Sequence, residues 1–280
     1  METNNISTFT KVHTTVSFIV MVLVNILANV IPFNGVTTGQ ISDSYPNLFA
    51  PAGITFSIWG IIYLSLASYL LYQFGLFNKK EGIINKEVIE KAGIFFTISS
   101  IANTVWIFVW HYRAIGISLF MIVIILLCLI IINVTIKKAN LITREKIFLR
   151  LPFSIYFGWI TVAVIANVSV FLVSINWNRF GLSESFFTII VLFSGLLIAC
   201  LTILKNQDLA YGLVVIWAYV GILIRHTSSS GLAGRHPFII AFLIICIILL
   251  LITAVYAAVA DKEKLKSFRL LRFKKEKSEP

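Results

Sequence analysis

The stretch PAGITFSIWGIIY, residues 51–63, enters a long apolar run of the chain and places Trp59 within it. Two further apolar runs have the same character: NTVW at 103–106, and the stretch 151–167, which begins with Leu-Pro and ends at Asn167. An amide that is buried in hydrocarbon costs several kcal/mol unless it finds a partner, so such side chains face other helices or a cavity. The three runs therefore predict a shared polar and aromatic interior between membrane helices.

The composition of the whole chain indicates a membrane protein. Of the 280 residues, 59% are hydrophobic and only 12% are charged, whereas a soluble domain has about 25% charged residues. Eight apolar runs of roughly 17–25 residues are each long enough to cross a hydrocarbon core of about 30 Å as an α-helix. We therefore expect an all-α integral membrane protein, an eight-helix transmembrane bundle. The predicted spans are residues 14–33, 54–74, 92–110, 114–136, 151–175, 186–204, 209–225 and 238–260.

The distribution of lysine and arginine predicts how the chain is oriented. Of the 23 basic residues, all but Arg113, Arg179, Arg225 and Arg235 fall on the same side as the N-terminus. Because basic loops stay in the cytoplasm, we expect a multi-pass protein of the cell membrane with both termini cytoplasmic. The tail 261–280 either lies on an anionic inner leaflet or only anchors the topology.

Aromatic and amide residues recur at helical spacing within the runs. Phe56, Trp59 and Tyr63 stand at i, i+3 and i+7 on one face of a helix. Asn103, Trp106 and Trp110 repeat that spacing in the next run. Such faces either pack between helices, where asparagine often serves as a contact, or line a pocket. We interpret the aromatic and amide residues of these runs together as the lining of a pocket. The candidate ligand-binding residues are Phe56, Trp59, Tyr63, Asn103, Trp106, Tyr156, Trp159 and Asn167.

The connection 34–53 is the longest one on the outer side of the predicted bundle. A loop of this length between adjacent spans is either a lid or disordered. Tyr45, Leu48 and Phe49 give it apolar groups that can cover the mouth of a cavity. This composition favours the lid.

Several other polar and aromatic residues have simpler interpretations. Trp110 and Trp177 lie near span ends, as expected for the aromatic belt at the membrane interface. Asp208 begins the seventh span and suits a helix N-terminus. Arg225 and His226 flank a glycine- and serine-rich outer loop, where we expect them to be solvated.

The three runs resemble the signature of the TspO/MBR family, the tryptophan-rich sensory proteins that include the translocator protein, or peripheral benzodiazepine receptor. Residues 51–63 and 103–106 are similar to its first two motifs, and Trp159 and Asn167 keep the offset of its third. The resemblance covers residues 14–178 and implies a five-helix bundle with a pocket near the loop between its first two helices. It also implies ligands such as porphyrins, haem-like tetrapyrroles, sterols and synthetic aromatic compounds.

Three features depart from that family. Three extra residues separate Pro152 from Trp159, which keeps them on similar faces but shifts them by about 4.5 Å in depth. Three more spans follow, so we expect an extended form: a TspO-like five-helix domain at 1–178, three additional helices at 179–260 and a basic cytoplasmic tail at 261–280. The sterol-associated pattern expected at the end of the fifth helix lacks its tyrosine in residues 173–179, so sterol is not favoured.

The sequence leaves two functional hypotheses. The first is a ligand-binding sensor or receptor of the tryptophan-rich sensory type, holding a flat hydrophobic ligand such as a porphyrin; the tetrapyrrole class follows from the resemblance alone. The alternative is a secondary transporter or permease for a small lipophilic or amphipathic solute, although the spans show no repeat and few charges. We expect no enzyme, no metal site and no certain cofactor. The expected partners are membrane lipids and a hydrophobic small molecule, not nucleic acid, and a homodimer is left open.

Overall fold

The structure is a computed structural model that describes residues 6–77 and 85–276, with side chains as far as residue 260. The described residues form helices and loops, and eight of the helices are long and apolar enough to cross a membrane. The predicted all-α membrane bundle is therefore confirmed. The long helices are α1 (Thr8–Val30), α3 (Ile58–Gln73), α4 (Lys86–His111), α5 (Ile115–Lys137), α7 (Leu151–Ser174), α8 (Glu184–Asn206), α9 (Leu209–Thr227) and α10 (Pro237–Glu276). The short helical turns are η1 (Phe33–Gly35), α2 (Thr38–Asp43), η2 (Gly53–Ser57), α6 (Thr143–Glu145), η3 (Lys146–Arg150) and η4 (Arg179–Gly181).

Short polar side chains set where several of these helices begin. The Ser7 hydroxyl accepts a hydrogen bond from the backbone N–H of Thr10, so α1 starts earlier than the apolar run predicts. Asp208 caps α9 in the same way, because its carboxylate accepts from the Tyr211 N–H at 3.1 Å. Each cap satisfies a backbone N–H that a helix start otherwise leaves without a partner. The predicted capping role of Asp208 is thus what the structure shows.

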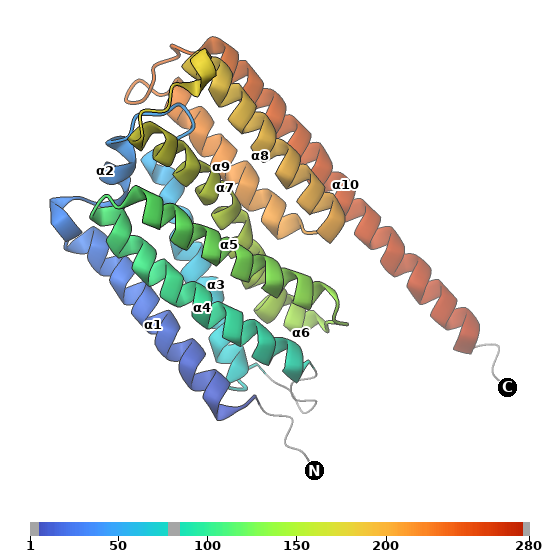
Figure 1. Cartoon of the computed structure of the whole chain (residues 1–280). Helices are drawn as coiled ribbons and strands as arrows, with labels where there is room; N and C mark the ends of the chain where they lie inside the picture. Colours follow the sequence, from blue (N-terminus) through green and yellow to red (C-terminus); the bar gives the residue numbers. More distant parts are fainter. Residues whose placement is uncertain (1–5, 78–84, 277–280) are drawn as a thin grey trace.

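The helices form two groups that meet at α7 and α9 (Figure 1). In the first group α4 packs on α1 and α5, α5 packs on α7, and α7 packs on α3. In the second group α10 packs on both α8 and α9. The two groups are joined chiefly where α9 lies along α7. Helix α10 continues to Glu276, past the predicted end of the last span at residue 260; residues 277–280 lie outside the described part.

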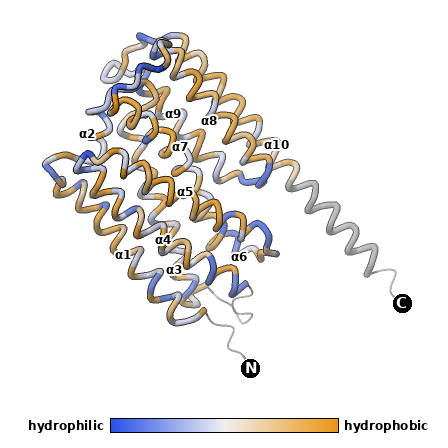
Figure 2. Tube along the Cα trace, viewed as in Figure 1, coloured by the Kyte–Doolittle hydropathy of each residue, from blue (hydrophilic) through white to orange (hydrophobic). Residues whose placement is uncertain are grey.

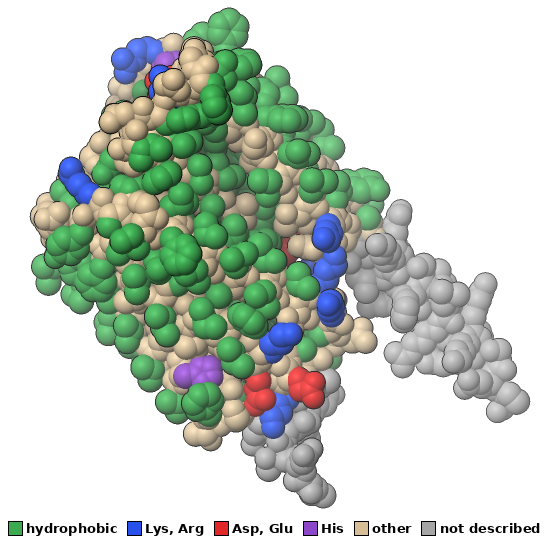
Figure 3. Space-filling model, in the orientation of Figure 1, with side chains coloured by type: hydrophobic (Ala, Val, Ile, Leu, Met, Phe, Trp, Pro, Cys, Tyr) green, Lys and Arg blue, Asp and Glu red, His purple; other side chains and the backbone are tan. Residues whose placement is uncertain are grey.

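The outer surface of the bundle is apolar along the length of the helices. Figure 2 shows hydrophobic residues over most of the described helices, with hydrophilic segments near the two ends of the bundle, and Figure 3 shows hydrophobic side chains over the middle of one face. Leu64, Phe120 and Ile252 are 76%, 61% and 60% exposed. Side chains of this kind are stable at such positions when hydrocarbon surrounds them. The protein is therefore a multi-pass membrane protein.

Hydrogen bonds between loops distinguish the two ends of the bundle. At one end Lys137 donates to the carbonyl of Lys205, and Arg150 donates to the carbonyl of Asn206 at 2.9 Å. This end carries the basic segments that the sequence analysis assigns to the cytoplasmic side. At the other end, the connection between α1 and α3 is held against α4 and α9.

Candidate ligand-binding site

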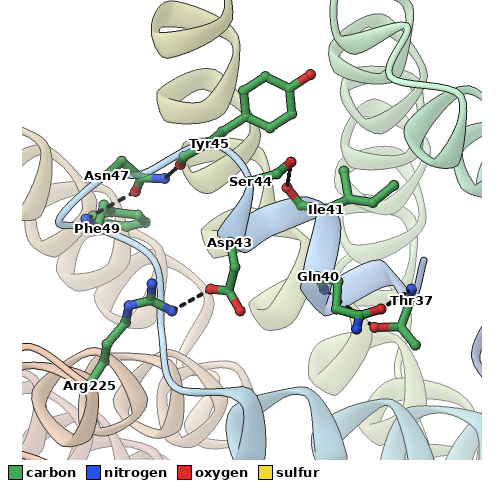
Figure 4. A network of polar contacts seen from close by, with 9 residues as sticks. All are labelled: Thr37, Gln40, Ile41, Asp43, Ser44, Tyr45, Asn47, Phe49 and Arg225. Carbon is green, nitrogen blue, oxygen red and sulfur yellow. Dashed lines mark hydrogen bonds and ion pairs between the residues drawn. The ribbon is translucent and has the colours of Figure 1, made fainter. Parts of the chain in front are cut away.

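The connection between α1 and α3 is folded, and we refer to residues 34–57 as the lid segment. It includes α2, whose start is fixed by a reciprocal pair of hydrogen bonds: Gln40 N–H donates to the Thr37 hydroxyl at 3.3 Å, and Thr37 N–H donates to the Gln40 side chain at 2.7 Å (Figure 4). Further along, the Asn47 side chain accepts from the Phe49 N–H at 3.1 Å. Ile41 and Phe49 are buried. The segment has the local structure of a cap over the helix ends.

The lid segment is tied to the end of α4. The indole N–H of Trp110 donates to the Thr38 carbonyl at 3.2 Å, and the Asn34 side chain donates to the His111 carbonyl at 3.2 Å. Trp110 is only 4% exposed and stacks on Trp106. Its assignment to the interfacial belt was therefore wrong, because the lid segment covers the ring and uses its N–H.

Helix α9 holds the lid segment from the other side. Trp217 donates to the Thr55 carbonyl at 3.0 Å, and the Ala52 N–H donates to the Gly221 carbonyl at 2.9 Å. Gly221 has no side chain because Thr55 fills the space: a Cβ there would lie 2.0 Å from the threonine hydroxyl. Trp217 and Gly221 are one helical turn apart, so they lie on one face of α9.

The next turn of α9 continues these contacts. Arg225 pairs with Asp43 at 2.7 Å (Figure 4), and the buried ring of His226 donates from Nε2 to the Leu48 carbonyl at 2.8 Å. The expectation that Arg225 and His226 are simply solvated was therefore wrong. The signal was present in the sequence as the spacing of Trp217, Gly221 and Arg225 at i, i+4 and i+8.

An inner cavity of about 60 Å³ lies among α3, α4, α5 and α7 below the lid segment. Its aromatic wall is built by edge-to-face contacts: the ring of Trp159 lies 5.9 Å from that of Phe56 and 6.1 Å from that of Trp59. Asn103 and Asn167 also line it. Aromatic rings favour this geometry, and the two contacts join Phe56, Trp59 and Trp159 into one wall.

An outer groove of about 490 Å³ adjoins the inner cavity, between α1, the lid segment, α3 and α4. The two spaces share Thr38, Phe56, Trp59 and Trp106 as lining residues. In the groove Trp59 stacks on Tyr63, with ring centres 5.5 Å apart and planes at 24°. The rings shared by both spaces thus form the partition between them.

The asparagine side chains at the site form hydrogen bonds with side chains of other helices. The Asn25 amide donates to the Asn103 side chain at 2.7 Å, and Asn103 donates to the Tyr156 hydroxyl at 3.4 Å. Ser118 donates to the Asn167 side chain at 3.2 Å. These amides fix α1, α4, α5 and α7 relative to one another, which is the packing role left open by the sequence.

Three other polar groups at the site have no hydrogen-bond partner among the described residues. They are the hydroxyl of Tyr63 and the indole N–H groups of Trp106 and Trp159, all buried. A buried donor without an acceptor costs about 1–3 kcal/mol, so natural proteins seldom keep one without a reason. All three residues line the outer groove or the inner cavity. The site therefore combines flat aromatic walls with hydrogen-bond donors that have no acceptor among the described residues.

A comparison with models of known protein families identifies the family of the chain. The family model described as TSPO-like protein matches residues 11–256. The chain belongs to the TSPO-like protein family. The match extends past residue 178, where the resemblance ends, through α8 and α9 and into α10. The helices that the sequence analysis treats as an addition thus lie within the region of the family model. Comparison with curated proteins and with solved structures gave no match.

In this TSPO-like protein most of the predicted ligand-binding residues lie together. Tyr156 lines neither space and instead stands behind the wall, with its ring 6.0 Å from that of Trp59. Sequence reasoning missed Trp110 and Thr38, which belong to the lining of the inner cavity. The predicted residues that line the outer groove or the inner cavity are Phe56, Trp59, Tyr63, Asn103, Trp106, Trp159 and Asn167.

Proposed function

We propose that this TSPO-like membrane protein is a ligand-binding sensor or receptor that holds a flat hydrophobic molecule in the outer groove. The observation that carries the proposal is the set of buried donors on Tyr63, Trp106 and Trp159, which have no acceptor among the described residues. Small turns of these side chains toward the groove or the cavity would let oxygen or nitrogen acceptors at the edge of a ligand satisfy them. Stacking on the shared rings would supply most of the apolar contact.

The volumes of the outer groove and the inner cavity support different roles in binding the ligand. The outer groove, at about 490 Å³, lies within the range of about 300–1,000 Å³ found for small-molecule sites. The inner cavity of about 60 Å³ has room only for a substituent or for water. The body of the ligand would therefore lie in the groove, against Trp59 and Trp106, with one edge directed toward Trp159.

A porphyrin or related tetrapyrrole is the leading candidate because of the family. Its planar ring suits the stacked Trp59 and Tyr63, and its carboxylates are acceptors for the unused donors. No histidine of the described chain lines the groove or the cavity, so the residues present offer stacking and hydrogen bonds rather than an imidazole ligand for a metal. No Asp, Glu, Lys or Arg of the described residues lines either space.

We also propose the arrangement in the cell. The basic segments at one end of the bundle support a cell-membrane location with both termini cytoplasmic and the lid segment outside. Residues 1–178 would form the ligand-binding domain, and residues 179–260 would support its lid through α9. Membrane lipids would be the constant partners of the apolar surface.

A fluorescence titration tests the proposed function. The full chain, purified in detergent, is titrated with protoporphyrin while tryptophan emission is followed, in wild type and in Trp59→Phe, Trp106→Phe and Trp159→Phe. Loss of one hydrogen bond to the ligand should weaken binding about threefold to tenfold in Trp106→Phe and Trp159→Phe. Trp59→Phe should weaken it through the smaller stacking surface. Trp177→Phe, which lines neither space, is the matched control and should bind as wild type does. Unchanged affinity in all three site variants would refute the proposal.

A further inference from the structure

A third cavity of about 360 Å³ lies behind the lid segment, and we refer to it as the rear cavity. It is bounded by residues 46–49 of the lid segment, the end of α7 and the start of α8, which lie at the same end of the bundle as α2 in Figure 1. It shares no lining residue with the inner cavity or the outer groove. It is therefore a separate space, close to the proposed outer surface of the membrane.

The lining of the rear cavity is amphipathic. Val191, about two turns inside α8, and Leu172, in the last turn of α7, give its wall apolar side chains. Its rim, formed by the connection between the two helices and by the lid segment, carries Asn47, Asn176 and Arg179. Helix α8 packs on α10 and only slightly on α7, so the two walls diverge. A molecule with a polar head and an apolar tail matches this gradient.

The rim carries one positive and one negative side chain that do not pair. The Nε of Arg179 is buried and has no hydrogen-bond partner among the described residues. Glu184 also lines the rear cavity, yet no ion pair joins these two side chains in the described structure. Arg179 as a whole is partly exposed, so its guanidinium can be reached from the rim while the buried Nε lacks an acceptor. The planar fork of a guanidinium suits phosphate. The carboxylate of Glu184, in turn, suits a cation.

An aromatic group adjoins the charges. The ring of Trp177 lies 5.0 Å from that of Phe180 and 5.1 Å from that of Phe187, both edge to face. Trp177 and Phe187 line the rear cavity. The face of an indole ring attracts ammonium groups, and tryptophan is favoured at the depth of lipid headgroups.

The backbone at the rim is strained in a way that fixes these side chains. Arg179 and Phe180 have φ of 56° and 54°, in the left-handed region that residues with large side chains rarely adopt. The Asn178 side chain holds the turn by accepting from the Phe180 N–H at 3.1 Å. Strain of this kind is found at ligand sites, where it positions a side chain.

We propose that the rear cavity binds the zwitterionic headgroup of an outer-leaflet phospholipid, with its phosphate on Arg179 and its ammonium between Glu184 and Trp177. The first part of the acyl chains would lie against Leu172 and Val191. A water-soluble phosphate–ammonium zwitterion shares the headgroup chemistry. The apolar side chains of Leu172 and Val191 in the lining favour the lipid over such a solute.

The test measures binding of dihexanoyl phosphatidylethanolamine to the delipidated full chain in detergent. Arg179→Gln should weaken binding about tenfold or more, because a charge-assisted contact is lost. Arg113→Gln removes an exposed arginine that does not line the rear cavity, and it should leave binding unchanged. Equal affinity of wild type and Arg179→Gln would overturn the proposal.

A second variant keeps the test decisive if Arg179→Gln fails to fold. Glu184→Gln changes an exposed side chain, and it should weaken binding of dihexanoyl phosphatidylethanolamine while leaving that of dihexanoyl phosphatidylglycerol, which has no ammonium, unchanged. An equal effect on both lipids, or none on either, would refute the zwitterion assignment. Soluble phosphoethanolamine should bind more weakly than the lipid, and equal affinity would overturn the lipid assignment in favour of a solute.

Discussion

Replacing Gly221 by alanine should separate α9 from the lid segment with a single methyl group. The added Cβ would lie 2.0, 2.6 and 2.8 Å from Oγ1, Cγ2 and Cβ of Thr55, whereas ordinary contacts are 3.4–4 Å. Thr55 is fully buried, so its side chain has no open space into which to turn. The lid segment around Thr55 must therefore shift relative to α9, which also lengthens the hydrogen bond from the Ala52 N–H to the Gly221 carbonyl.

The expected cost follows from these contacts. Overpacking a tight site costs about 1–3 kcal/mol, and a weakened backbone hydrogen bond adds about 1 kcal/mol. The higher helix propensity of alanine offsets about 1 kcal/mol of this loss of stability. The Gly221→Ala variant should therefore be about 1–3 kcal/mol less stable than wild type. Because Phe56 follows Thr55 and lines the outer groove, protoporphyrin binding should weaken as well.

Unfolding in mixed micelles with increasing SDS, followed by tryptophan fluorescence, measures the stability. Gly60→Ala is the matched control: Gly60 is an exposed residue of α3, and a Cβ there would meet nothing within 4 Å. That variant should be as stable as wild type or more stable by up to about 1 kcal/mol. If Gly221→Ala were as stable as Gly60→Ala and bound ligand normally, α9 would not hold the lid segment as described.

Three further experiments probe other contacts of the lid segment by the same unfolding assay. Thr55→Val should be neutral or stabilising by up to about 1 kcal/mol, because it removes a buried hydroxyl that has no partner among the described residues; a loss above about 1 kcal/mol would contradict this. A double-mutant cycle of Asp43→Asn and Arg225→Gln should give a coupling free energy of only about 0.2–1 kcal/mol that declines with salt, since both side chains are partly exposed. A larger coupling that salt does not change would contradict a surface ion pair. Trp110→Phe should cost at least about 1 kcal/mol through the lost hydrogen bond to the lid segment, and no cost would show that the bond contributes nothing.

The spans could be predicted from the sequence because the hydrocarbon core of a membrane admits few structures other than long apolar helices. A run of apolar residues of this length must form a helix that satisfies its own backbone, and no tertiary information is needed. The helix ends were less predictable. Helix α1 begins early because Ser7 caps it, and the Ser7 N–H donates to the Glu90 side chain at 2.8 Å, a contact across 83 positions.

The aromatic faces of the candidate site were also predictable, since Phe56, Trp59 and Tyr63 repeat at helical spacing. The contacts that the sequence did not reveal join distant segments. Trp110 looked like an interfacial residue because the Thr38 carbonyl that takes its N–H lies 72 positions away. Spacing within a helix gives the face of a side chain, but only the fold gives its partner.

The six tryptophans provide the most direct test of the site, because each indole N–H gives its own resonance in a ¹⁵N–¹H spectrum. Protoporphyrin added to the labelled full chain should change the resonances of Trp59, Trp106 and Trp159. Those of Trp177, in the rear cavity, and Trp217, whose N–H is bound to the Thr55 carbonyl, should stay in place. Changes confined to Trp177 or Trp217, with the other three unmoved, would contradict ligand binding in the outer groove.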